Sequence, residues 1–163
     1  MAGKVIFLAL RTALAWTFIH AGVLKIWDFG HGQPATPDFV IAIQQYKLLP
    51  WPDLTVLLAV YLPWVEVFAG VGLFVRRVRL GAALTITALT MIFIGALGSA
   101  WMRGLRIDCG CFGRDEVSTD YPTLLWRDAF ILAAALFFLV RDARQGAEKD
   151  RPMFGERGRF TLP

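Results

Sequence analysis

The chain has little charge for its size, and this scarcity limits what it can be. Of its 163 residues only 18 % are charged, whereas 56 % are hydrophobic, and the mean hydropathy is +0.54. Because ordinary soluble domains are less apolar, the composition excludes that class and predicts an integral membrane protein. No aromatic–basic interleaving or nucleic-acid motif accompanies the basic residues, so we expect them to meet lipid and not nucleic acid.

Cysteine and histidine are scarce too, with two of each in the whole chain. Both cysteines lie in one loop, where only Gly110 separates Cys109 from Cys111. A zinc site needs three or four ligands, and no histidine or further cysteine lies in this loop, so we expect no metal. A disulfide between cysteines so close requires a tight backbone turn. Gly110 permits that turn, since glycine adopts positive φ without steric cost.

A bridge across so short a loop would be strained, and strained disulfides are the labile or catalytic ones. The loop therefore predicts a redox-active pair, Cys109 and Cys111, supported by Gly110, Phe112 and Gly113. Two alternatives stay open: inert thiols in a glycine-rich turn, and a disulfide that only braces the loop.

Long hydrophobic runs are abundant, and four of them approach the roughly 20 residues that a membrane-spanning helix needs. They extend from Val5 to Trp27, Leu54 to Val75, Leu80 to Trp101 and Leu124 to Val140. We predict an all-α, four-helix integral membrane bundle over residues 1–144, followed by a basic tail over 145–163. The first run is expected to be a retained helix and not a cleaved signal peptide.

The connection between the first two runs contains a turn-rich linker, Asp28 to Pro34, and after it a short stretch with helical periodicity. From Pro37 to Pro50, apolar residues recur at helical spacing over a stretch too short to span a bilayer. This pattern predicts an amphipathic helix that lies in the membrane interface.

Basic residues predict the orientation of the bundle. Arginines follow the second run at Arg76, Arg77 and Arg79, and further arginines begin at Arg141 after the fourth run. By the positive-inside rule these ends are cytoplasmic, and both termini lie with them. The cysteine loop then faces the extracytoplasmic side, where disulfides form and persist.

Three candidate polar groups lie in the first run. Arg11 and Lys25 share one helix face, whereas His20 points to the opposite side. Lys25 is near the end of the run, where its ammonium group can snorkel to the interface, which makes it a weak functional signal on its own. For His20 two roles stay open, a hydrogen bond between helices and proton handling near a redox site.

The second run carries a fourth candidate group, Glu66. It shares a helical stripe with Ala59, Pro63 and Gly70, which predicts that Glu66 faces the bundle. A carboxyl group in mid-membrane is costly unless it is paired or protonated. Counting depth along the helices predicts Arg11 as its partner and places Lys25, near the opposite surface, too far along the membrane normal to be the first choice.

Six of these features, taken in order, carry a resemblance to a known family. They are Arg11 in an alanine-rich helix, Gly22-Val23-Leu24-Lys25, Tyr46-Lys47-Leu48-Leu49-Pro50, Leu62-Pro63 with Glu66, Cys109 to Gly113, and Arg127. Residues 8–140 resemble the MauE branch of the DoxX-like membrane proteins. The Cys-Gly-Cys-Phe-Gly loop is the most diagnostic part.

The resemblance implies a bacterial inner-membrane protein that performs disulfide chemistry with a thioredoxin-like periplasmic partner. The chemistry would serve maturation of a cysteine-rich redox enzyme, methylamine dehydrogenase in the founding case. With one cysteine pair, electrons must pass directly to the partner and to an electron sink, for which quinone is the natural cofactor. Glu66, Arg11 or His20 would then handle protons.

Two other functions stay open. The chain could be a non-catalytic small subunit or scaffold of a larger membrane complex. It could also be a quinone-linked oxidoreductase subunit for small sulfur compounds, as the wider DoxX group suggests.

Overall fold

The computed structural model describes residues 2–48, 50–105 and 121–149, and the side chains of 5–144 within those ranges. The elements in chain order are α1 (Ala2–Ile26), β1 (Trp27–Asp28), β2 (Gln33–Pro34), α2 (Thr36–Gln45), α3 (Pro52–Gly72), α4 (Arg79–Met102) and α5 (Tyr121–Lys149). Four of the helices are long and apolar enough to cross a membrane. The all-α membrane bundle and the short helix between its first two spans are thus confirmed.

Three details differ from the expectation. Helix α2 ends at Gln45, before the predicted end at Pro50. The segment predicted as a linker forms a small antiparallel hairpin, in which Trp27 pairs with Pro34 and Asp28 with Gln33. Helix α5 continues to Lys149, beyond the predicted end of the apolar run at Val140. A helix continues through polar residues once it leaves the membrane, since its backbone hydrogen bonds do not depend on an apolar sequence.

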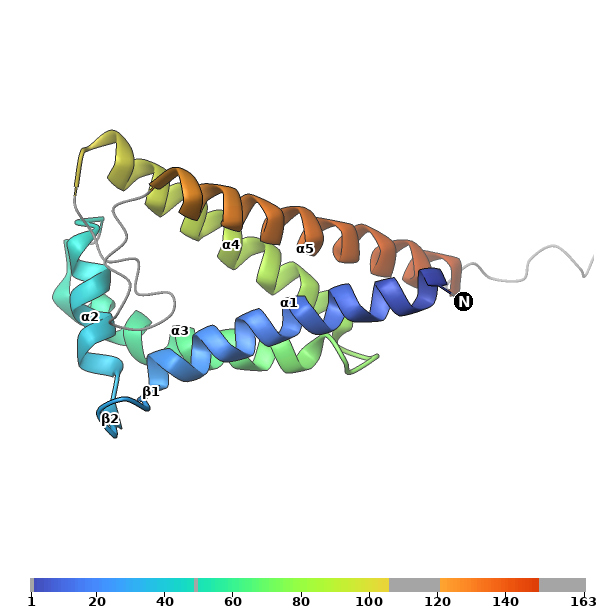
Figure 1. The fold of residues 1–163 in the computed structure, drawn as a ribbon, viewed down its shortest axis with the longest axis horizontal. Coiled ribbons are helices and arrows are strands. Elements are labelled where there is room, and N and C mark those ends of the chain that lie inside the picture. The colour runs from blue at the N-terminus through green and yellow to red at the C-terminus, as the bar shows by residue number, and fades with distance from the viewer. Residues whose placement is uncertain (1, 49, 106–120, 150–163) are drawn as a thin grey trace, which may run out of the picture.

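The spanning helices form two antiparallel pairs, α1 with α3 and α4 with α5. In Figure 1 the pairs lie close together at the end that carries the N-terminus and diverge toward the end that carries α2. We call these the N-terminal end and the α2 end. Helix α2 packs on α3 through a small cluster in which Phe39 and Ala42 meet Ala59.

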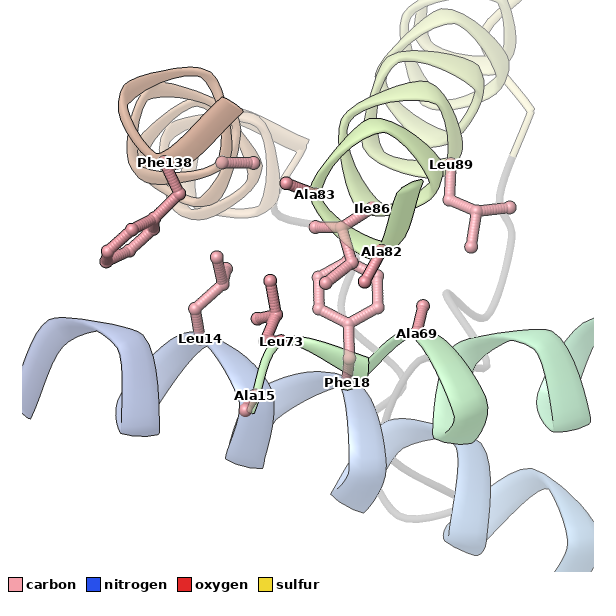
Figure 2. Close-up of a cluster of buried hydrophobic side chains, with 11 residues drawn as sticks. Leu14, Ala15, Phe18, Ala69, Leu73, Ala82, Ala83, Ile86, Leu89 and Phe138 are labelled. Atoms are coloured by element: carbon pink, nitrogen blue, oxygen red, sulfur yellow. The ribbon is translucent and has the colours of Figure 1, made fainter. Parts of the chain in front are cut away.

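The main core lies where the two pairs converge (Figure 2). It is built from side chains of all four spanning helices, namely Leu14, Ala15, Phe18, Ala69, Leu73, Ala82, Ala83, Ile86, Leu89, Ala135 and Phe138. Many of these side chains are small. Lipid tails are as apolar as leucine, so helices in a membrane associate by close packing, which small residues permit.

Helices α1 and α3 approach at backbone contact distance. A Cβ atom added to Gly22 would lie 2.6 Å from the Pro63 carbonyl oxygen, and one added to Gly70 would lie 2.9 Å from the Ala15 carbonyl oxygen. Pro63 lies inside α3 and has no backbone N–H to donate. Membrane helices tolerate such a proline where neighbouring groups satisfy the backbone carbonyl that loses its hydrogen bond. This close crossing brings the polar side chains of α1 and α3 within reach of one another.

The buried face of α5 carries an acid toward each of its ends. Asp128 and Asp142 are both buried, as are Leu124, Ala135 and Phe138 between and beside them. The spacing of these positions follows the helical repeat of one stripe. On α3, the predicted stripe of Ala59, Pro63, Glu66 and Gly70 is buried as well, which confirms that it faces the bundle.

Candidate functional site

Lys25 and Glu66 form an ion pair between α1 and α3. The Lys25 Nζ donates to both carboxylate oxygens of Glu66, at 2.6 and 2.7 Å. Only 4 % of the Lys25 side chain and 2 % of the Glu66 side chain are exposed. The ammonium also lies 5.2 Å from the ring centre of Phe39 and 5.1 Å from that of Phe93, where the ring faces attract a cation. The Glu66 carboxylate and the two aromatic rings together offset the cost of removing the Lys25 charge from water.

This geometry corrects two expectations. Lys25 does not snorkel to the interface, and Glu66 does not pair with Arg11. Helical side chains lean toward the N-terminus of their helix, so the Lys25 side chain leans from the α2 end back into the bundle. Counting the depth of Cα atoms misses this lean. The contact between Gly22 and Pro63 brings the two backbones close enough for the lysine to reach.

Arg11 instead pairs with Asp142 of α5. Its Nη2 donates to both oxygens of the Asp142 carboxylate, each at 3.0 Å. The same lean carries the Arg11 side chain toward the N-terminal end and away from Glu66. Asp142 was missed because it follows the predicted end of the fourth run. The signal that could have found it is its place on one helical stripe with Ala135 and Phe138.

The Lys25–Glu66 pair borders a cavity of about 50 Å³ that all four spanning helices line. Thr90 of α4 and Arg127 and Asp128 of α5 add polar groups to the lining. Arg127 Nε donates to Asp128 Oδ1 at 3.1 Å. A water needs roughly 10–15 Å³ of such space, so the cavity has room for a few waters.

The cavity does not fit a quinone ring. A cavity that holds benzene measures about 150 Å³, against about 50 Å³ here. The cavity beside Lys25 and Glu66 is therefore too small to hold a quinone ring.

Hydrogen bonds tie the elements together at the α2 end. The Tyr121 hydroxyl donates to the Leu105 carbonyl, and the Arg103 guanidinium donates to the Tyr46 carbonyl at 2.5 Å and to the Lys47 carbonyl at 3.4 Å. Burial, with smaller electrostatic contributions that include Tyr121, raises the pKa of Tyr46 to about 12. The Tyr46 ring therefore stays neutral at physiological pH.

These contacts place the two ends of the segment 106–120. Leu105 precedes the segment and Tyr121 follows it, and the hydrogen bond between them holds both at the α2 end, the end on which Lys25 lies. The predicted redox residues, Cys109, Gly110, Cys111, Phe112 and Gly113, lie outside the described residues. Their role stays a prediction.

His20 lies away from this site. It is on the exposed face of α1, opposite the buried face of Arg11 and Lys25 as predicted, and its ring stacks on Trp16 with centres 5.8 Å apart. It is not among the residues that line the cavity. Its two predicted roles stay untested.

Four spanning helices with ion pairs buried between them define a multi-pass helical membrane protein. The chain belongs to the MauE family, since the family described as "Methylamine utilisation protein MauE" matches residues 3–141. A relative from Paracoccus denitrificans, "Methylamine utilization protein MauE", is 34 % identical over 130 residues, which are 78 % of this chain and 65 % of the relative. A protein of the same name from Methylophilus methylotrophus is 38 % identical over 78 residues, 47 % of this chain and 40 % of that protein.

The chain thus spans less than two thirds of the length of these relatives. No solved structure matches it.

Proposed function

We propose that this protein is a membrane accessory factor of methylamine utilisation that exchanges disulfides through Cys109 and Cys111. The family and its relatives' names support the pathway. The observation that supports the site is the hydrogen bond from Tyr121 to Leu105, which holds both ends of the cysteine segment at one end of the bundle. A segment whose two flanking residues are held there would present its cysteines to a protein partner at the membrane surface.

The proposed exchange needs no reactants besides two dithiol couples. A thiolate of a reduced thioredoxin-like partner attacks one sulfur of the Cys109–Cys111 disulfide, which forms a mixed disulfide and releases the other cysteine as a thiolate. The partner's second thiolate then attacks the mixed disulfide. The partner leaves with a disulfide, Cys109 and Cys111 end as thiols, and two electrons have moved. The reverse sequence delivers the same two electrons to the partner.

In this proposal the Lys25–Glu66 pair has a structural role. Both carboxylate oxygens of Glu66 accept hydrogen bonds from Lys25, so the pair holds α1 to α3. The exchange passes protons only between the two dithiols, so it requires no buried proton carrier.

The proposal includes an orientation of the bundle in the membrane. With the arginine-rich end in the cytoplasm of a bacterial inner membrane, the cysteine segment faces the periplasm. That compartment keeps disulfides oxidised and would contain the partner.

The test is growth on methylamine of a host whose own MauE-family gene has been deleted. We expect Cys109→Ser and Cys111→Ser each to abolish growth while the protein inserts at normal abundance. Ser118→Ala, in the same segment, is the matched control and should support normal growth. In one of the two cysteine variants, a non-reducing gel should show a covalent adduct with a thioredoxin-like protein.

Normal growth with both cysteines replaced would contradict the exchange chemistry. It would favour the non-catalytic subunit or scaffold of a larger membrane complex, because neither cysteine would then be needed.

A further inference from the structure

Arginine side chains gather at the N-terminal end of the bundle. The charges of Arg79 and Arg141 both act on the guanidinium of Arg11, and Asp142 is the acid that acts on it there. The Arg11 and Arg141 guanidinium carbons lie 4.7 and 3.8 Å from the ring centre of Phe7, so two like charges share one aromatic ring. Three guanidinium groups against one described carboxylate leave two positive charges without a counter-charge among the described side chains.

Two donors in this cluster lack acceptors. The Nε groups of Arg11 and Arg79 are buried, and neither finds a hydrogen-bond acceptor among the described residues. The Arg11 side chain is 4 % exposed, and the two oxygens of Asp142 accept from its Nη2 alone. A buried charged donor without an acceptor costs about 1–3 kcal/mol or more. The cluster therefore has both the charge and the donors for an anion.

Arg79 and Arg141 lie near the ends of their spanning helices, the level at which phospholipid head groups are expected. Arg79 is the first residue of α4, and Arg141 lies within one helix turn of Arg144, where the fourth span ends. Arg11 is about 9 Å along α1 from Val5, the start of the first span. The N-terminus of α4 adds unpaired amides and a positive dipole end, both of which favour an anion. Basic pockets between membrane helices bind anionic head groups in this way.

We propose that Arg79 and Arg141, with Arg11 behind them, form a binding site for a phosphate group, which in the membrane is the phosphodiester of an anionic phospholipid. Guanidinium groups pair with phosphate oxygens through two parallel N–H donors. The site is at the opposite end of the bundle from Leu105 and Tyr121, the described residues on either side of the segment 106–120. The proposal does not depend on the exchange chemistry of that segment.

The test uses the purified full-length protein in nanodiscs of phosphatidylcholine, with and without phosphatidylglycerol. We expect phosphatidylglycerol to raise the thermal unfolding midpoint and to remain bound in native mass spectrometry in preference to phosphatidylcholine. Arg79→Gln should weaken the retention at least about tenfold, because one charged hydrogen-bonding partner is lost. Arg79→Lys, which preserves the charge at the start of α4, should fall between the two and serves if Arg79→Gln does not fold.

The matched control is Arg77→Gln. Arg77 is exposed in the turn before α4, so this variant removes the same charge outside the cluster. Equal losses in Arg77→Gln and Arg79→Gln would mean diffuse surface attraction and would overturn the site. So would equal retention of the two lipids by the unaltered protein.

A second arm separates the two sources of phosphate. Inorganic phosphate is added at the ionic strength of a chloride control. A rise in the unfolding midpoint that Arg79→Gln removes would support the site and assign it to free phosphate. A response to phosphatidylglycerol alone supports the lipid.

Discussion

The ammonium of Lys25 lies 2.6 Å from Glu66 Oε1, beside the point where Gly22 meets the Pro63 carbonyl. The pair thus depends on the close crossing of α1 and α3 as well as on its own charges. Side chains at Gly22 or Gly70 would push the two backbones apart and weaken the pair.

Removing one partner of the Lys25–Glu66 pair should destabilise the protein strongly. Lys25→Met or Glu66→Gln alone leaves a buried charge without its counter-charge, and we expect a loss of about 3–5 kcal/mol in the free energy of unfolding. The double variant should recover part of that loss, because no uncompensated charge remains. Denaturant unfolding in detergent, arranged as a double-mutant cycle, measures this coupling. Additive losses would show that the two side chains do not interact.

Arg11 and Asp142 should show the same coupling, whereas Arg11 and Glu66 should show little. Arg11→Leu and Asp142→Asn remove the two ends of a pair held at 3.0 Å. Glu66 has a different partner, so Arg11→Leu with Glu66→Gln is the matched control cycle. Coupling in the control as large as in the Arg11–Asp142 cycle would contradict the observed pairing.

Gly22→Ala should destabilise the α1–α3 contact. The added Cβ would lie 2.6 Å from the Pro63 carbonyl oxygen, which belongs to the backbone and cannot rotate away. Overpacking of this kind costs roughly 1–3 kcal/mol. Gly95→Ala on α4 is the control, since its added Cβ meets nothing within 4 Å. Thermal unfolding of the two variants in the same detergent compares them, and equal midpoints would refute the close crossing.

The hairpin carries a pH-dependent contact. A hydrogen bond between His31 Nδ1 and Asp28 Oδ2 at 2.8 Å, helped by the backbone N–H groups of Gly30 and His31, holds the pKa of Asp28 below its ordinary value. Because the folded pKa is lowered, the contribution to stability is present above pH about 3.9 and is lost as the pH falls through the lower folded value.

Carboxyl-carbon NMR of Asp28 measures this pKa. In His31→Ala we expect the pKa of Asp28 to rise toward its ordinary value, since the imidazole hydrogen bond, the largest cause of the lowered pKa, is lost. An unchanged pKa in that variant would show that the backbone donors alone lower it.

Topology is open to direct labelling. We expect a membrane-impermeant maleimide to label Cys109 or Cys111 in intact spheroplasts after reduction, because the charge distribution predicts that their segment lies outside. A cysteine-free variant is the control for background labelling. Labelling that appears only after lysis would reverse the proposed orientation.

Local features of the sequence determined the spanning helices, the short helix between the first two, and the stripe that buries Glu66. Each follows from the length of an apolar run or from helical periodicity, which act within a segment. The family followed from the order of motifs such as Gly22 to Lys25 and the Cys-Gly-Cys loop. The role of that loop stays a prediction, because Cys109 and Cys111 lie outside the described residues.

Only the tertiary structure decided which cation meets which acid. Arg11 could reach either Glu66 or Asp142 when judged by depth alone, and Lys25 could turn to the interface or inward. Helical side chains lean toward the N-terminus of their helix, which directs Arg11 toward Asp142 and Lys25 toward Glu66. The close crossing of α1 and α3 at Gly22 brings Glu66 within reach of Lys25. A sequence shows the helix face and the approximate depth of a charged side chain. Its partner depends on how closely other helices pack at that point, and this packing is determined jointly by segments that lie far apart in the chain.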